Sequence, residues 1–190
     1  MWTTGVLREE HLWIMRMLQC MERLILDCER EQRLDPSRAA ELMALFAHFA
    51  DGLHQEREER HLFPRLLSRA RSPDERMEIG RLCGEHEEER RAMARMCQSL
   101  LGAIFGQSRS LREFQRDGLR YVAMQRHHIQ HENAALLPLA EQLLTSADDE
   151  AVMQGFVELE HASPQKLKQI LARIQALCAQ SGIETATSDA

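Results

Sequence analysis

The strongest constraint on the fold of this chain is a pattern of histidine, glutamate and proline that occurs twice. One copy begins at His54, and the second begins at His128, 74 residues later. In each copy a glutamate follows the histidine by four residues, and a proline follows it by ten. Residues four apart lie on one face of an α-helix, about 6 Å apart along its axis. Each copy is therefore predicted to turn an imidazole and a carboxylate toward one point. The residues of the repeat are His54, Glu58, Pro64, His128, Glu132 and Pro138.

A second repeat lies upstream of each copy, where a glutamate is followed directly by a histidine. These histidines are His11 and His86, 75 residues apart. His11 precedes His54 by 43 residues, and His86 precedes His128 by 42. His11 and His86 both fall on the apolar stripes of predicted helices, so we expect them to point inward. The matched spacing predicts two helical hairpins related by a pseudo-two-fold axis.

The composition favours helices throughout. Straight-chain residues and alanine are abundant, whereas the chain has only 9 glycines and 5 prolines. Pro64 is expected to kink or end the second helix. The short connections predict an all-α, up-down-up-down four-helix bundle with an additional C-terminal helix or helices. The predicted helices cover about residues 4–33, 36–63, 73–105 and 110–144, with a short helix from Ser146 and a last one from Ser163-Pro164.

Length, charge and hydropathy limit the class of protein. A chain of 190 residues suits one domain, which we expect over residues 1–180. Its bundle core would cover about 6–145 and its helical addition 146–180, followed by a flexible tail over 181–190. The net charge of −6 argues against binding to nucleic acid or an anionic membrane. No apolar run approaches about 18 residues and the N-terminus has no apolar signal core, so a cytoplasmic location is expected.

The five cysteines do not form a recognisable framework. Their number is odd and they show no C-x-x-C spacing, which argues against structural disulfides or a zinc knuckle. Cys28, Cys83 and Cys97 fall on apolar helix faces and are predicted to be small buried hydrophobes. A redox role is the lesser alternative.

The inward histidines and glutamates predict a metal centre. A buried carboxylate without partners costs several kcal/mol. Two divalent cations would satisfy all six side chains, and imidazole with carboxylate suits iron or manganese better than structural zinc. Chance His/Glu pairs on the helix surface are the alternative, and their repetition at one offset argues against it. The predicted ligands are His11, His54, Glu58, His86, His128 and Glu132.

Over about residues 6–145 the sequence resembles the hemerythrin-like, or HHE cation-binding, family. The resemblance implies the up-down-up-down bundle and a non-haem centre of two iron ions with an oxo or hydroxo bridge. By this match His11 and His54 would hold one iron, His86 and His128 the other, and Glu58 and Glu132 would bridge them. Ferritin-like di-iron bundles use Glu-x-x-His instead, so the order and spacing here separate the two families. The resemblance is carried by Glu9-Glu10-His11, the segment 54–59 with Leu62-Phe63-Pro64, Glu85-His86, and the segment 128–132 with Leu137-Pro138.

One position departs from the oxygen-carrying hemerythrins. These have a further histidine one turn after the histidine of the third helix, where this chain has Arg90. Two histidines for each iron is similar to the family branch linked to nitric oxide response and to repair of damaged iron centres. The repair branch often carries a cysteine-bearing N-terminal segment, which is not expected here because the first predicted ligand, His11, lies so early in the sequence. More open metal positions favour transient binding of diatomic molecules or peroxide over stable oxygen carriage. Glu89 is an alternative carboxylate ligand.

Several further residues near the predicted centre carry separate expectations. His61 is expected to be exposed at the end of the bundle, with a place beside the metals as the alternative. Asp51 is expected either to orient an imidazole or to lie solvated on the surface. His131 is expected to hydrogen-bond Glu132, and Tyr121 to be a core aromatic with a satisfied hydroxyl rather than a redox residue. Surface or capping roles are predicted for His48, His127 and His161.

The leading functional hypothesis is a di-iron protein that binds or senses oxygen, nitric oxide or peroxide. An alternative is iron handling, by donating iron to damaged iron–sulfur centres or by buffering it. A weak peroxidase or oxidase, and a helical interaction module without metal, are further alternatives. A binding or sensing protein is favoured over a dedicated enzyme. The expected partners are a small diatomic ligand or peroxide, without nucleic acid or membrane, and either a second copy of the chain or an iron-acceptor protein.

Overall fold

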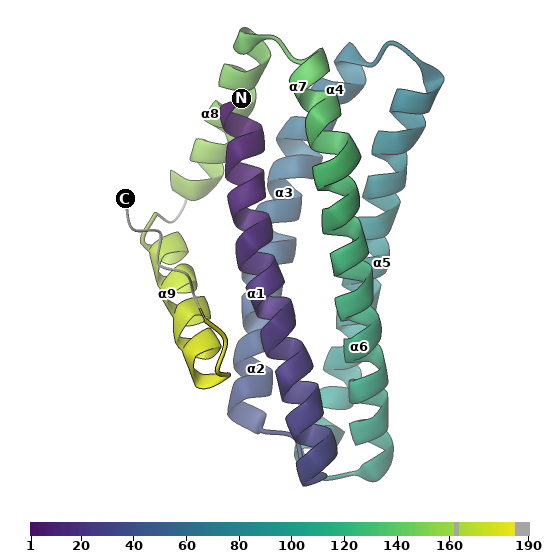
Figure 1. The fold of residues 1–190 in the computed structure, drawn as a ribbon, viewed down its shortest axis with the longest axis vertical. Coiled ribbons are helices and arrows are strands. Elements are labelled where there is room, and N and C mark those ends of the chain that lie inside the picture. The colour runs from purple at the N-terminus through teal and green to yellow at the C-terminus, as the bar shows by residue number, and fades with distance from the viewer. Residues whose placement is uncertain (162–163, 185–190) are drawn as a thin grey trace.

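The computed structural model describes residues 1–161 and 164–184, and it contains helices and no strand within these ranges. Four long helical segments run antiparallel to one another along the molecule (Figure 1). This confirms the predicted up-down-up-down bundle. The first segment is α1 (Trp2–Glu31) and the third is α5 (Pro73–Ile104). The second comprises α2 (Pro36–Leu45), η1 (Phe46–His54), α3 (Gln55–Arg57), η2 (Glu58–Leu62) and α4 (Phe63–Arg69). The fourth comprises α6 (Ser108–His131), η3 (Glu132–Leu136) and α7 (Leu137–Leu143).

The helix starts follow the capping signals of the sequence. The carboxylate of Asp35 accepts hydrogen bonds from the backbone N–H groups of Ser37 and Arg38, both at 3.0 Å, and begins α2. Ser72 and Glu75 form a capping box at the start of α5. These caps fix where the second and third segments begin.

Pro64 does not end the second segment, which was one of the two outcomes predicted for it. The helix continues to Arg69 because the turn before the proline is π-helical, and the N–H of Phe63 bonds to the carbonyl of Glu58 five residues back. The same arrangement precedes Pro138, where η3 provides the wider turn. The extra residue shifts the hydrogen-bond register at the point where the proline ring would clash with the carbonyl four residues earlier.

Two apolar clusters fill the interior, one toward each end of the bundle. The larger contains Ile14, Phe46 and Phe114, and the smaller contains Leu7 and Phe63. Leu7 and Ile14 are two turns apart on α1 and belong to different clusters. The polar residues between them therefore lie between the two apolar clusters. Cys28 is buried as predicted and Cys83 half-buried, whereas Cys97 is exposed, so the prediction that Cys97 is buried was wrong.

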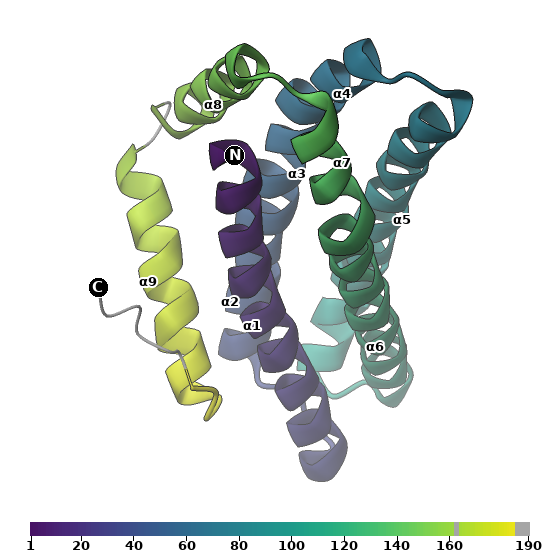
Figure 2. The ribbon, with the colours of Figure 1, turned by 45° about the horizontal axis from the view of Figure 1, so that its top comes forward.

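Two C-terminal helices complete the molecule. α8 (Ser146–His161) crosses the end of the bundle near the N-terminus, and α9 (Pro164–Gln180) runs beside α1 and α2 (Figure 2). Phe156 of α8 is buried in the smaller apolar cluster, and Ile174 of α9 in the larger one. None of the described helices is both long and apolar enough to cross a bilayer. Ser163 and residues 185–190 of the predicted tail lie outside the described residues, as does the side chain of His161.

Candidate metal centre

All six residues predicted as metal ligands meet between the two apolar clusters. None is more than 2 % exposed. They come from all four bundle segments, and three of them lie at a junction between α-helical and π-helical turns. The six residues are His11 of α1, His54 of η1, Glu58 of η2, His86 of α5, His128 of α6 and Glu132 of η3.

These residues form two groups of four that could each hold a metal ion. Within each group, one potential ligand atom from every residue lies within 4.8 Å of the others. Glu58 and Glu132 belong to both groups. One group is completed by His11 and His54, and the other by His86 and His128. The shared carboxylates give the centre the arrangement of two adjacent cation sites with common ligands.

The distances show how closely the two groups interlock. The Nε2 atom of His86 lies 3.3 Å from a carboxylate oxygen of Glu58 and 3.9 Å from one of Glu132. The Nε2 atoms of His11 and His128 lie 3.0 Å and 3.1 Å from the two different oxygens of Glu132. Glu132 thus faces both groups, one through each oxygen.

Several of these atoms have no hydrogen-bond partner among the described residues. They are Nε2 of His11 and His54 and all four carboxylate oxygens of Glu58 and Glu132. Burial and the charge of Glu132 raise the pKa of Glu58 well above its ordinary value, and burial lowers the pKa of His54. His128 and Glu132 shift the other way despite their burial: the charge of Glu132 raises the pKa of His128, and the charge of His128 lowers the pKa of Glu132. The metal-free cluster therefore favours one imidazolium–carboxylate pair and disfavours charge on Glu58 and His54. A buried set of imidazoles and carboxylates with free lone pairs fits divalent metals that bind nitrogen and oxygen ligands.

The opposite nitrogen of each histidine has an acceptor of its own. The four Nδ1 contacts are His54 to Glu10 at 2.9 Å, His128 to Glu85 at 2.8 Å, His86 to Glu59 at 2.8 Å and His11 to Asn133 at 3.1 Å. An acceptor at Nδ1 holds the proton there and leaves Nε2 free to face a metal, the usual arrangement around metal-bound histidines.

The Nδ1 acceptors follow the internal repeat. Glu10 and Glu85 precede the upstream histidines, and each contacts the other histidine of its own half. Glu59 and Asn133, which are 74 residues apart, each follow a shared glutamate and contact a histidine of the other half. The sequence signal was present, but the role of these four residues was not predicted.

Arg57 is a buried residue beside the candidate centre that the sequence analysis did not single out. The residue is 1 % exposed, and its guanidinium bonds to Glu10 and to Glu160 of α8. It also lies over the ring of Phe156, 5.1 Å from the ring centre. Through Glu10, Arg57 connects α8 to the imidazole of His54.

Neither Arg90 nor Glu89 of α5 belongs to the two groups of potential metal ligands. Arg90 donates hydrogen bonds to Gln55 and Glu59, both at 2.8 Å. One oxygen of Glu89 accepts from Gln55 and Gln125, both at 2.8 Å, and Glu89 belongs to neither group of four. Burial raises the pKa of Glu89 to about 8.

Three side predictions need correction. Asp51 does not orient His54, whose acceptor is Glu10; one oxygen of Asp51 is buried without a partner among the described residues. His131 contacts Glu78 at 2.5 Å rather than Glu132, because its side chain points to the outside of the bundle. Tyr121 is a core aromatic as predicted, but its hydroxyl has no partner in the described part of the chain.

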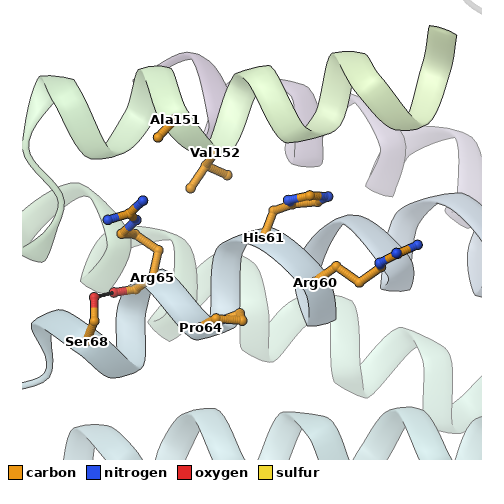
Figure 3. Close-up of a pocket in the computed structure, with 7 residues that line it drawn as sticks. All are labelled: Arg60, His61, Pro64, Arg65, Ser68, Ala151 and Val152. Atoms are coloured by element: carbon orange, nitrogen blue, oxygen red, sulfur yellow. Dashed lines mark hydrogen bonds between the residues drawn. The ribbon is translucent and has the colours of Figure 1, made fainter.

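His61 is neither exposed nor at the centre. It is half-buried beneath α8, where its ring lies 6.3 Å from that of Phe156. Gly155 makes this approach possible, since a Cβ atom there would lie 2.2 Å from Nδ1 of His61. His61 lines a surface pocket of about 280 Å³ together with Arg60 and Arg65. Figure 3 shows these residues between α8 and the second segment. His48 and His127 are exposed, as expected.

Comparison with known proteins gives one match. The family described as the hemerythrin HHE cation binding domain matches residues 3–140. That range includes all six residues of the two groups and the Nδ1 acceptors, whereas α8 and α9 lie beyond it. No curated protein and no solved structure matched the chain.

Proposed function

Because the chain belongs to the hemerythrin HHE cation-binding family, we propose that it is a non-haem di-iron protein that binds or senses small oxidants. His11 and His54 would hold one iron and His86 and His128 the other, with Glu58 and Glu132 shared between them. The observation that carries this proposal is that both carboxylates belong to both groups and are buried without hydrogen-bond partners among the described residues. A single cation would leave one pair of imidazoles unused.

Bound iron supplies redox-active, Lewis-acidic positions that take oxygen, nitric oxide or peroxide. The residues of the chain set the conditions for that chemistry. The Nδ1 acceptors fix the imidazoles, and the apolar clusters keep water out; the ring of Phe63, for example, stacks on that of His86 at 5.6 Å. Arg90 leaves the position one turn after His86 without a ligand. Two histidines for each iron support transient binding over stable oxygen carriage.

Iron donation or buffering is a second candidate. It is favoured by the surroundings of His86 and His128, whose Nδ1 acceptors Glu59 and Glu85 are only partly buried. In the other half, the acceptor of His54, Glu10, is buried, whereas that of His11, Asn133, is exposed. His54 therefore has the most protected surroundings of the four imidazoles, and an acceptor protein would reach His86 and His128 more easily than His54. In this role iron would leave the reduced protein within minutes of adding an acceptor.

Metal analysis tests the ligand assignment. Protein purified under anaerobic, reducing conditions is expected to contain about two irons per chain, and Glu58→Gln and Glu132→Gln should each retain less than half of that, because each carboxylate serves both ions. Glu88→Gln on the exposed face of α5 is the matched control and should keep the full content. Circular dichroism verifies that each variant is helical. Equal iron in all variants would contradict the assignment.

Titration with small molecules tests the function itself. Under the proposal, nitric oxide, oxygen or peroxide changes the near-ultraviolet and visible absorption of the reduced iron protein. The spectrum of Glu88→Gln should change in the same way. Iron transfer to a chelating acceptor without any spectral response to the three molecules would favour the second candidate.

A further inference from the structure

Two cysteines from distant parts of the chain lie in direct contact outside the metal centre. Cys20 is in the middle of α1 and Cys178 is in the last turn of α9. Their sulfur atoms are 3.5 Å apart, and both side chains are buried. They belong to the larger apolar cluster, where α9 packs on α1.

We propose that Cys20 and Cys178 form a redox pair that hydrogen peroxide converts into a disulfide joining α9 to α1. A disulfide bond is about 2.05 Å long, so the sulfurs must approach by about 1.5 Å. The inference is independent of the metal centre and of the function proposed for it.

The surroundings of the pair distinguish the roles of the two thiols. The thiol of Cys20 donates a hydrogen bond to the sulfur of Cys178. This hydrogen bond lowers the pKa of Cys178, and the charge of Arg16 acts in the same direction, whereas the pKa of Cys20 is raised. Cys178 is therefore the thiol that reaches the reactive thiolate form first.

The reaction is balanced with peroxide as the only co-reactant. The thiolate of Cys178 attacks one oxygen of hydrogen peroxide, the O–O bond breaks, and the leaving hydroxide takes a proton to become water. Cys20, once deprotonated, attacks the sulfur of the resulting sulfenic acid, the S–O bond breaks, and a second water leaves. Two thiols lose two electrons to one peroxide and yield one disulfide.

Access to the buried pair is provided by the C-terminal cap of α9. The N–H of Ile183 bonds to the carbonyl of Cys178 at 2.9 Å, and Gly182, with φ of 69°, donates to Ala179 at 3.1 Å. This is a Schellman motif, in which the residue after the glycine packs back on the helix. Ile183 contacts the larger apolar cluster and covers this end of the helix. Helix ends open more readily than the interior, so brief opening of the cap admits peroxide.

The test is mass spectrometry of the full-length protein after treatment with a small excess of hydrogen peroxide. Free thiols are alkylated before denaturation and again after it, and tryptic peptides are analysed without reduction. We expect loss of two of the five thiols and a cross-linked peptide joining Cys20 and Cys178. The melting temperature should rise with the cross-link and fall back when a reductant is added.

Matched variants complete the experiment. Cys97→Ser removes an exposed cysteine and should keep the cross-link, whereas Cys20→Ser and Cys178→Ser should abolish it. The measurement on the unaltered protein does not depend on the folding of any variant. The proposal is overturned if all five thiols stay free, if the cross-link involves other cysteines, or if Cys178 oxidises further without pairing.

Discussion

The two halves of the candidate metal centre have the same pattern of histidine and glutamate but different surroundings. In the first half, Glu10 holds His54 and is itself held by the buried Arg57 beneath α8. In the second half, Glu85 holds His128 and is paired with Arg81, and both are partly exposed. The repeat thus duplicates the potential ligands and their acceptors, whereas α8 covers one half only. We expect the two iron positions to differ in stability for this reason.

Replacing Arg57 should cause the largest loss of stability in either half. Arg57→Met leaves the carboxylate of Glu10 buried without its cation, and we expect a loss of about 3 kcal/mol in the free energy of unfolding. Arg81→Met removes the corresponding partly exposed cation of the second half, which pairs with Glu85, and should cost less than about 1 kcal/mol. Urea denaturation of both variants measures the difference. Equal losses would show that α8 does not protect the first half.

Substitution of the Nδ1 acceptors should show whether the two halves also differ in iron affinity. Glu10→Gln should weaken iron binding about 10–100-fold, because it removes a buried carboxylate that orients His54. Glu85→Gln should weaken it less, since water can replace part of the lost interaction. Competition with a chelator measures both, with the exposed neighbour Glu9→Gln as the control. A larger effect at Glu85 would reverse the assignment of the protected half.

Glu89 contacts both halves of the bundle, and its ionisation should make the stability of the protein depend on pH. One of its oxygens accepts from Gln55 of the second segment and from Gln125 of the fourth. The pKa of Glu89 is raised to about 8, from the ordinary value of 4.5. The folded metal-free protein therefore keeps this proton up to about pH 8, while the unfolded chain releases it near pH 4.5. The free energy of unfolding of the metal-free protein therefore falls as the pH rises from about 4.5 to about 8.

Glu89→Gln removes that dependence. The stability of the metal-free variant relative to the metal-free parent should grow by about 3 kcal/mol between pH 5 and pH 8. Urea denaturation at the two pH values measures this difference, and Glu88→Gln should show no such growth. The idea fails if the two proteins differ by the same amount at both pH values.

The smallest expected effect comes from the one acceptor that differs in charge between the halves. Asn133 is a neutral acceptor for His11, whereas Glu59 is a charged acceptor for His86. Asn133→Asp should make His11 a stronger ligand and slow iron loss a few-fold. The rate of iron transfer to a chelator measures the effect, and Gln130→Glu on the exposed face adds a negative charge as a control. Equal rates in both variants would show that only net charge matters.

Much of the fold and of the candidate centre could be predicted from spacing. The histidine–glutamate repeat identified all six residues that the structure brings together, because residues four apart share a helix face whatever the bundle around them. The helix starts at Pro36 and Pro73 were predicted because their capping signals are local. The π-helical turn that carries the helix through Pro64 was not predicted, since it depends on backbone register and not on residue type.

The sequence by itself determined which side chains point inward, because the period of the helix assigns each residue to a face. Only the tertiary structure decided what those side chains touch. The contact chain from His54 through Glu10 and Arg57 to Glu160 joins residues up to 150 positions apart, and it exists only because α8 crosses one end of the bundle. No local pattern specifies how far one helix lies from another or at what angle it crosses. The packing of the apolar clusters sets that geometry, and with it the difference between the two halves.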